Sequence, residues 1–283
     1  MQELTELGKK AVEVALKRGA EEAEAYLSMS TGTSIDIERG QIVRSAKNMD
    51  QGLGVRAVYG KAVGFAYTNT LTNKSIEEAA ERAFKAAKAS RPDKNWHKFP
   101  SQGSFLETRG TYDKKIEALS SDELVETAAT MLEATTAYDK RVLAVGGGVG
   151  VSVFQSAVVN SSGVEVFDRG TAVGCSMETI ARDGTDVTPA CFEVNAKRVY
   201  DIDPKAVGVE AARQAVSCLG AKKIESGVFP VIFAQPAFRS LLYYTLINAV
   251  KADYVQRERS ALKDKIGEKV ASDLVTVWDD GLL

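Results

Sequence analysis

The chain has 283 residues, of which 45% are hydrophobic and 26% are charged, and its formal net charge at pH 7 is −2. This composition is typical of a globular protein with a sizeable core, and it excludes the fibrous and disordered classes. The near-neutral charge, without blocks of lysine or arginine interleaved with aromatic residues, argues against direct nucleic-acid binding.

The sequence contains no signal for the membrane or for secretion. No window approaches the roughly 18 uninterrupted apolar residues of a membrane span, and the N-terminus lacks the apolar core of a signal peptide. Cys175, Cys191 and Cys218 are widely spaced, without a CxxC pair, which argues against a disulfide framework or a thiolate metal site. We therefore expect a cytoplasmic protein with free thiols and no membrane partner.

The first predicted unit, residues 1–92, has a helix at each end. Apolar residues recur at helical spacing over 4–18 and stop at Gly19, and the second helix, 75–90, starts after Asn73 and stops before a proline. Between the helices the period changes to two, as in an antiparallel meander. Five segments alternate in this way, with glycine, asparagine or aspartate at the breaks: 23–30, 33–40, 41–48, 52–60 and 61–69.

Residues 93–115 carry little periodicity and are interpreted as a connecting segment. The helix–strand–helix order then repeats in a second unit, 116–222, whose first helix covers 121–138 and is capped by residues of the Ser120–Glu123 stretch. Three strand-like stretches and a final helix follow, at 141–160, 163–182, 188–199 and 203–221.

A third unit, 227–283, contains a predicted strand at 229–234, an amphipathic helix at 239–250 and a second strand at 272–278. It is small for an independent core, and we expect it to be the truncated beginning of a C-terminal β-rich domain. The chain is thus predicted to be an α+β protein with large antiparallel sheets, built from two helix–β-meander–helix units and this third unit.

Candidate catalytic chemistry is scarce. The glycine cluster at 146–150 lacks the Lys-Ser/Thr of a phosphate-binding loop, so we interpret it as strands whose backbones approach closely. His97 is the single histidine, and without a GxSxG motif we predict that it lies in a surface loop. The acidic pair Asp279 and Asp280 is interpreted as a solvated turn rather than a cation site.

Residues 52–90 resemble the N-terminal signature of the TldD/PmbA family, in which a Gly-x-Gly-x-Arg strand and a Gly-Phe-Ala strand precede an alanine-rich helix. The resemblance covers nearly the whole chain, because further matching stretches occur in the family's order. These are Asn160-Ser161-Ser162-Gly163, Gly227-x-x-Pro230-Val231, Ser260-Ala261-Leu262, Gly267-Glu268-x-Val270-Ala271-Ser272 and Asp279-Asp280-Gly281.

In the TldD branch, the helix after the Pro-Val strand carries a His-Glu-x-x-x-His zinc peptidase motif. Counting from the paired leucines at 241–242, this chain has Tyr243, Tyr244 and Asn248 at those places. A phenol with a pKa of about 10 and an amide are poor zinc ligands, and a phenol cannot replace a glutamate base. We therefore expect neither a catalytic residue nor a metal ligand in this chain.

The resemblance thus points to the PmbA branch, also called TldE, whose members lack the motif. It implies a non-catalytic subunit that pairs with a zinc-bearing TldD-like subunit, or forms a homodimer, and that handles peptide substrates in a shared cavity. Tyr243, Tyr244 and Asn248 would face the partner or the cavity, although the tyrosines could equally fill a core. Two alternatives stay open: a regulatory protein-interaction module of the gyrase-modulator type, and an autonomous hydrolase with an unrecognised site.

Overall fold

The computed structural model describes residues 2–103 and 108–280, so part of the predicted connecting segment and residues 281–283 lie outside the described residues. The chain divides into two compact units, Met1–Ala221 and Lys222–Leu283. Within the described ranges, every helix is too short or too polar to traverse a lipid bilayer.

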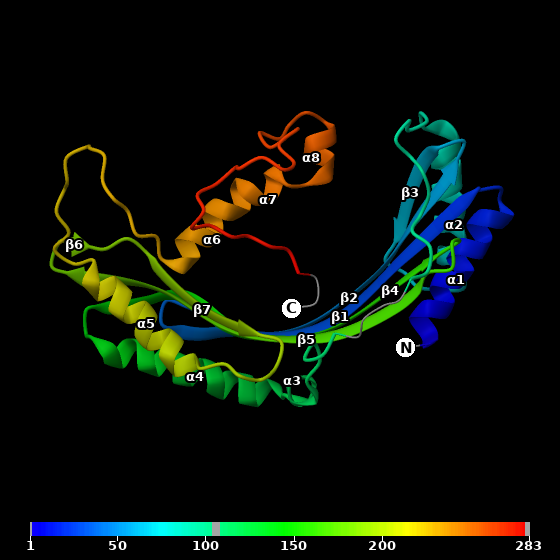
Figure 1. Cartoon of the computed structure of the whole chain (residues 1–283). Helices are drawn as coiled ribbons and strands as arrows, with labels where there is room; N and C mark the ends of the chain where they lie inside the picture. Colours follow the sequence, from blue (N-terminus) through cyan, green and yellow to red (C-terminus); the bar gives the residue numbers. More distant parts are fainter. Residues whose placement is uncertain (1, 104–107, 281–283) are drawn as a thin grey trace. The chain divides into compact units, whose positions relative to one another are not determined.

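The first unit is built on one antiparallel sheet, which confirms the predicted α+β class (Figure 1). Its strands are ordered β3-β2-β1-β4-β5-β6, and β7 also pairs with β5. Each of the two predicted N-terminal units supplies strands, and the pairing of β1 with β4 joins them in a single sheet. The bounds are β1 (Glu22–Glu38), β2 (Gln41–Tyr59), β3 (Ala62–Thr68), β4 (Val142–Asn160), β5 (Glu165–Asp183), β6 (Asp186–Val187) and β7 (Cys191–Lys197).

The helices predicted within the first compact unit, Met1–Ala221, are confirmed as α1 (Gln2–Lys17), α2 (Asn73–Ala89), α4 (Ser121–Tyr138) and α5 (Pro204–Ser217). A short helix that was not predicted, α3 (Lys114–Ala118), precedes α4. Helix α4 begins with the expected cap: the Ser120 hydroxyl accepts from the Glu123 backbone N–H, and the Glu123 carboxylate accepts from the Ser120 N–H. The reciprocal pair satisfies two N–H groups that a helix start would otherwise leave unbonded.

Strands β1 and β2 are each longer than predicted, because the expected breaks between 30 and 33 and between 48 and 52 do not occur. Gly32 pairs with Asn48 on β2 and with Ser152 on β4, so the ladder continues through it on both sides. The glycine marks a close approach to a neighbouring strand: a Cβ there would lie 3.0 Å from the Val151 carbonyl oxygen. The prediction of a break was wrong since glycine in a strand can mark such an approach as well as a turn.

Both hydrophobic cores of the first unit lie on the same face of the sheet. Leu27 belongs to the core formed with α1 and α2, whereas Ile35 belongs to the core formed with α4 and α5. The two residues are an even number of positions apart on one continuous strand, so their side chains point to the same side. Figure 1 shows the two helix pairs at opposite ends of the sheet. No helix among the described residues of this unit packs against the opposite face.

The glycine cluster of β4 allows the close strand approach expected from the sequence. A Cβ on Gly148 would lie 2.4 Å from the Ile35 carbonyl oxygen, and one on Gly147 would lie 2.4 Å from the Ser176 carbonyl oxygen. Real Cβ atoms do not approach backbone so closely. The cluster is therefore part of the sheet's packing, as predicted.

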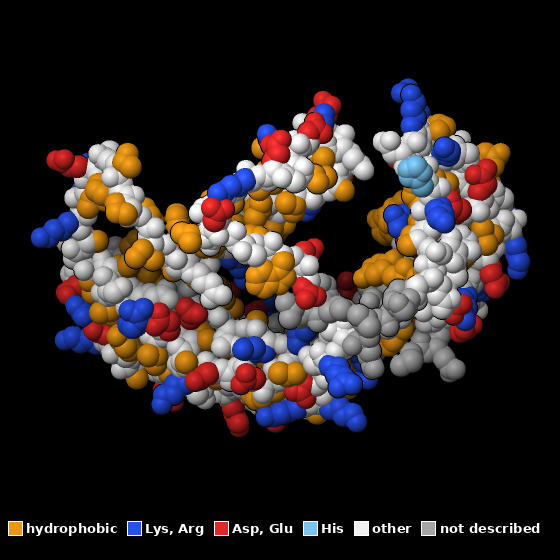
Figure 2. All heavy atoms as spheres, in the orientation of Figure 1, with side chains coloured by type: hydrophobic (Ala, Val, Ile, Leu, Met, Phe, Trp, Pro, Cys, Tyr) orange, Lys and Arg blue, Asp and Glu red, His pale blue; other side chains and the backbone are white. Residues whose placement is uncertain are grey.

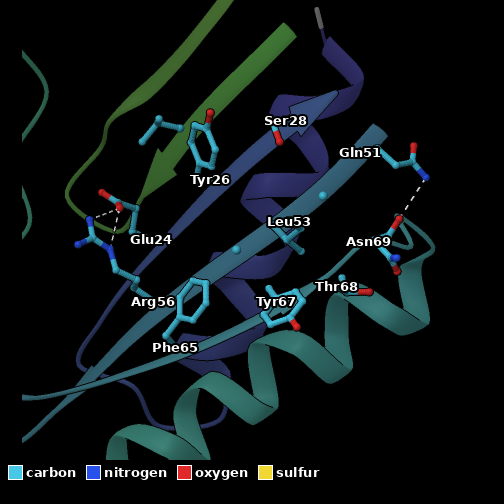
Figure 3. A pocket seen from close by; sticks show the side chains of 13 residues that line it. Glu24, Tyr26, Ser28, Gln51, Leu53, Arg56, Phe65, Tyr67, Thr68 and Asn69 are labelled. Atoms are coloured by element: carbon cyan, nitrogen blue, oxygen red, sulfur yellow. Dashed lines mark hydrogen bonds and ion pairs between the residues drawn. The ribbon is translucent and has the colours of Figure 1, made fainter. Parts of the chain in front are cut away.

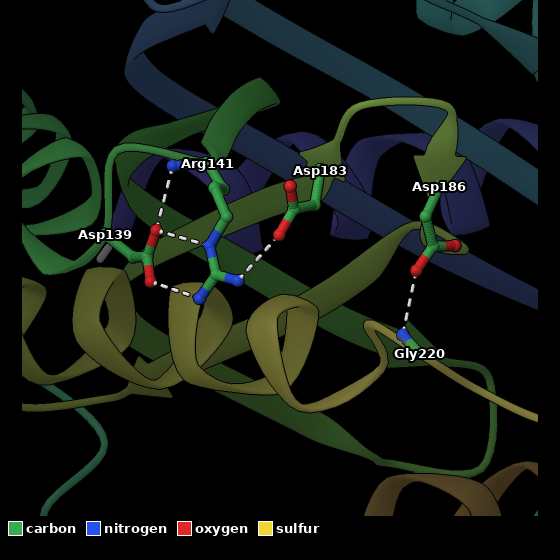
Figure 4. A network of polar contacts seen from close by, with 5 residues as sticks. All are labelled: Asp139, Arg141, Asp183, Asp186 and Gly220. Atoms are coloured by element: carbon green, nitrogen blue, oxygen red, sulfur yellow. Dashed lines mark hydrogen bonds and ion pairs between the residues drawn. The ribbon is translucent and has the colours of Figure 1, made fainter.

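A polar network ties the C-terminal end of α4 to the strands that follow (Figure 4). The Arg141 guanidinium donates to both oxygens of Asp139, at 2.8 and 3.0 Å, and to Asp183 at 3.1 Å. Hydrogen bonds from Arg141 lower the pKa of Asp139 to about 2. Because Asp139 caps α4 and Asp183 ends β5, the network joins a helix end to a strand end.

The second unit contains α6 (Gln235–Tyr244), α7 (Leu246–Ala249) and α8 (Ala252–Gln256). The predicted helix is confirmed, with a break at Thr245, but the strands expected at 229–234 and 272–278 are absent from the described residues. A strand needs a neighbour for its backbone groups, and these two segments do not pair with each other. None of residues 222–280 is buried, and Figure 2 shows hydrophobic side chains at the surface.

We predict that Gly148→Ala destabilises the protein by about 2–3 kcal/mol, because the new methyl group would force β1 and β4 apart. Gly150→Ala is the matched control in the same cluster, since its nearest contact would be the Thr33 carbonyl oxygen at an ordinary 3.7 Å. Urea denaturation measures both. Equal destabilisation by the two substitutions would contradict the packing role of Gly148.

A second prediction concerns Asp139. Its folded-state pKa of about 2 lies below the value of about 3.9 for an unfolded aspartate. The ionised carboxylate therefore adds to the free energy of unfolding above about pH 4, and this stabilisation is lost as the pH falls toward 2. Asp139→Asn should lower the urea midpoint at pH 5, and its difference from the wild type should shrink toward pH 2.5. The control is Asp50→Asn, at an exposed position on β2. A difference in urea midpoint between the variant and the wild type that stays constant with pH would refute the lowered pKa of Asp139.

Candidate functional site

The uncovered face of the sheet contains a hollow of about 540 Å³ on β1, β2 and β3 (Figure 3). One three-strand rung explains its shape: Tyr26 on β1 pairs with Gly54 on β2, which pairs with Tyr67 on β3. The glycine has no side chain to fill the space between the two tyrosines. The lining residues are Glu24, Tyr26, Ser28, Gln51, Gly52, Leu53, Gly54, Arg56, Phe65, Tyr67, Thr68, Asn69 and Val158.

Aromatic rings form the apolar wall of the hollow. Phe65 and Tyr67 stack at 6.2 Å, and they are 59% and 72% exposed, although each is large enough to anchor a core. Tyr26 is 51% exposed on the other side. Figure 2 shows hydrophobic side chains exposed over β3. Exposed aromatic side chains around a hollow are characteristic of binding surfaces rather than of an ordinary solvated face.

An ion pair closes one end of the hollow. The Arg56 Nε donates to the Glu24 carboxylate at 3.1 Å, and a second guanidinium nitrogen contacts the same oxygen. Arg56 also lies 5.1 Å from the ring centroid of Phe99, which is buried. Glu24 is buried, so the paired arginine offsets the cost of removing its charge from water. The pair therefore fixes the shape of this end of the hollow.

The other end of the hollow is polar and uncharged. The Gln51 amide donates to the Asn69 carbonyl oxygen at 3.3 Å. Ser28 and Thr68 also line this part of the hollow (Figure 3). Hydroxyl and amide groups can hydrogen-bond a peptide backbone, while the rings hold an apolar side chain. The lining residues include neither histidine nor cysteine. The arrangement therefore favours binding rather than covalent or acid–base catalysis.

The connecting segment is anchored beside this hollow. Glu22 accepts from the Trp96 indole N–H at 3.1 Å and from the Phe99 backbone N–H at 2.9 Å, and Phe99 is buried. His97 is exposed between these anchors, so its predicted place in a surface segment is confirmed. Among the described residues, no three histidine, cysteine or acidic side chains come close enough together to hold a metal ion.

Asn160 organises the turn after β4, at the same end of the sheet. Its side-chain oxygen accepts from the backbone N–H groups of Ser162 and Val164, at 2.9 and 3.1 Å, and its amide donates to the Pro100 carbonyl oxygen at 2.9 Å. Gly163 completes the turn with a φ of 91°. The Asn160–Gly163 stretch is therefore a structural turn that also fastens the connecting segment.

The three motif positions lie in the second unit, on both sides of a helix break. Tyr243 and Tyr244 are consecutive on α6, with rings 5.2 Å apart and 56% and 76% exposed. Asn248 lies on α7, after the break at Thr245, and accepts from Lys251 at 2.9 Å. The tyrosines are therefore not core residues of this unit. The structure brings the two tyrosines together and leaves Asn248 on a separate short helix.

These donors do not fit the zinc that the helix motif of the TldD branch implies. Neutral phenols and an amide bind zinc poorly, whereas zinc prefers imidazole, thiolate and carboxylate ligands. The two places that hold the histidine ligands in the motif, Tyr243 and Asn248 in this chain, also lie on separate helices, α6 and α7, on either side of the break at Thr245. No chemical step is assigned to zinc on this chain.

Sequence reasoning did not identify the hollow, although a signal was available. In the Gly52-Leu53-Gly54-Val55-Arg56 strand, the first, third and fifth residues share one face by strand alternation, and all three line the hollow. Phe65, from the Gly-Phe-Ala strand, lies opposite Arg56. Two stretches that carried the family resemblance thus form the floor and wall of the hollow.

Comparison with protein families gives a consistent result along the chain. Residues 23–87, 114–219 and 226–283 match, respectively, domain 1, the central domain and the C-terminal domain of the PmbA/TldA metallopeptidases. These matches confirm the predicted TldD/PmbA resemblance. They cover more than half of the chain.

Individual relatives agree with this result. The chain is 27% identical to the metalloprotease TldD homolog of Haemophilus influenzae, over 94% of this chain and 57% of that protein. It is 26% identical to the metalloprotease PmbA of Escherichia coli O157:H7, over 90% of this chain and 57% of that protein. The chain thus spans less than three fifths of the length of these relatives.

The fold is also similar to a solved structure. TldE from Thermococcus kodakarensis superposes with a TM-score of 0.81 at 25% identity, covering 94% of this chain and 60% of that one. The two chains thus share an overall fold.

Proposed function

The chain belongs to the TldD/PmbA family of metallopeptidases, and on that basis we propose that it is a non-catalytic subunit of the PmbA/TldE type. It pairs with a zinc-bearing subunit of the TldD type, and together they form a complex that degrades or processes peptides. The partner supplies the zinc and the catalytic base, while this chain supplies binding surface.

The observation that carries this proposal is the identity of the residues at the motif positions. Tyr243, Tyr244 and Asn248 replace the two imidazoles and the carboxylate that the resemblance places there. A zinc peptidase needs those groups to hold the ion and to activate water. A chain without them contributes to peptide hydrolysis through another subunit.

The hollow on the uncovered face supports a role in peptide handling. Phe65 and Tyr67 offer an apolar surface for one peptide side chain, and Gln51 and Ser28 offer hydrogen bonds for its backbone. Such a site recognises an unfolded peptide, whose apolar side chains and amide groups are accessible, better than a folded protein. At its uncharged polar end, the hollow offers hydrogen bonds to the peptide backbone rather than a partner for a charged side chain.

We predict that the purified chain binds no stoichiometric zinc and cleaves no unfolded casein peptide by itself. Addition of a TldD-type subunit with the His-Glu-x-x-x-His motif, from the same genome, should give chelator-sensitive cleavage above that of the partner alone. Elemental analysis and a peptide assay measure the two outcomes. One zinc per chain with chelator-sensitive activity, or a partner fully active without this chain, would refute the proposal.

A further prediction concerns the hollow. Phe65→Ser combined with Tyr67→Ser should raise the KM of the complex for an unfolded peptide by about tenfold, because each aromatic contact contributes about 0.5–1.5 kcal/mol. Tyr138→Ser is the control, since Tyr138 is also exposed but lies on α4, outside the hollow. An unchanged KM in the double variant, with the complex intact, would exclude the hollow from peptide binding.

The exposed tyrosines of α6 give a separate prediction. Tyr243→Ala combined with Tyr244→Ala should weaken association with the TldD-type subunit, because exposed aromatic side chains are favoured at interface cores. Light scattering of the mixture measures the complex. The control is Phe238→Ala, an exposed aromatic five residues before Tyr243 on the same helix. Equal losses in both variants would indicate a general effect on α6 instead of a contact made by the tyrosines.

A further inference from the structure

Helix α5 packs against β7, and two of the three cysteines lie at the ends of these two elements. Cys191 is the first residue of β7, and Cys218 follows the last residue of α5. Both thiols are free and partly buried, whereas Cys175 is free and buried in the core under α4 and α5. The proposed function uses none of them.

Two hydrogen bonds hold the segment around Cys218 against the segment around Cys191. On one side, the Gln214 amide donates to the Glu193 carboxylate at 3.0 Å. On the other side, the Gly220 backbone N–H donates to the Asp186 carboxylate at 2.8 Å (Figure 4). Along the chain, Cys218 lies between Gln214 and Gly220. Their two hydrogen-bond partners, Asp186 and Glu193, likewise lie on either side of Cys191. The end of α5 is therefore held along the segment that contains Cys191.

The two side chains interact within this frame. Burial raises the pKa of the Cys191 thiol, and the neighbouring Cys218 raises it further. The Cys191 sulfur lies 3.8 Å from the Pro189 carbonyl oxygen, which orients it. A partly buried pair held in this way can react with small molecules, because it remains accessible while its geometry is restricted.

We propose that Cys191 and Cys218 form a reversible dithiol–disulfide pair that links the end of α5 to β7. The oxidant is a low-molecular-weight disulfide of the glutathione type. One cysteine thiolate attacks a sulfur of this disulfide, which breaks its S–S bond and releases one small thiol. The other cysteine then attacks the mixed disulfide, forms the protein S–S bond and releases a second small thiol. Two electrons and two protons pass from the protein to the small molecule.

The disulfide would join α5 to β7 close to Ala221, the last residue of the first unit. The disulfide closes a loop of about 28 residues that includes α5, and such loops restrict the unfolded chain. Reaction should accelerate with rising pH, because the thiolate is the attacking form and the pKa of Cys191 is raised. Cys175 is an internal control: burial raises its pKa to about 11, and it is only 2% exposed.

The test equilibrates the full reduced chain with mixtures of reduced and oxidised glutathione, followed by trapping of thiols, tryptic digestion and mass spectrometry. The three cysteines fall in separate tryptic peptides, 170–182, 183–197 and 214–222. We expect a cross-link between the peptides 183–197 and 214–222, with one remaining free thiol in 170–182. Oxidation should raise Tm by about 5–10 °C, and reduction should reverse the change.

Variants make the test specific. Cys191→Ser and Cys218→Ser should each abolish the cross-link and the Tm shift, whereas Cys175→Ser should keep both. Because the cross-link is first measured in the wild type, the test does not depend on how well any variant folds. Mixed disulfides with glutathione on Cys191 or Cys218 without a cross-link, or cross-links that include Cys175, would overturn the proposal.

Discussion

The alternation of side chains along β1 is the constraint on which the first unit depends. The strand is paired on both edges, with β2 and β4, so its two faces are defined over its whole length. One face contributes Leu27 to the first core and Ile35 to the second. The other face contributes Tyr26 and Ser28 to the hollow. Two helix pairs and the hollow are thus positioned by one strand.

Local patterns in the sequence were sufficient to predict α1, α2, α4, α5 and most of the sheet, but not the short α3 or the continuity of β1 and β2. Capping residues such as Ser120 and Glu123 act within one turn, so their effect can be read from neighbouring positions. The length of β1 could not be read in this way, since Gly32 is compatible with both a turn and a strand. Only the pairing of Gly32 with residues on β2 and β4 shows that it lies in a strand and not in a turn.

The site and the second unit also combine features that residue type or local pattern determines with features that depend on contacts between distant segments. The prediction that Tyr243, Tyr244 and Asn248 do not hold zinc rests on residue type alone, so it needs no knowledge of the fold. The hollow depends on Gly54 lying between Tyr26 and Tyr67, and strand register is a property of three segments far apart in sequence. The segments 229–234 and 272–278 alternate like strands, yet among the described residues they have no partner to pair with.

The shared strand has a consequence for how this fold can change during evolution. Insertion or deletion of a single residue in β1 between Leu27 and Ile35 would reverse the orientation of every side chain beyond it. One core would then face the side of the sheet that its helices do not cover. A bulge could absorb one extra residue, as the register shift between β1 and β2 near Asp36 already does. Length changes in this part of the chain are therefore tolerated in pairs, or together with a compensating bulge.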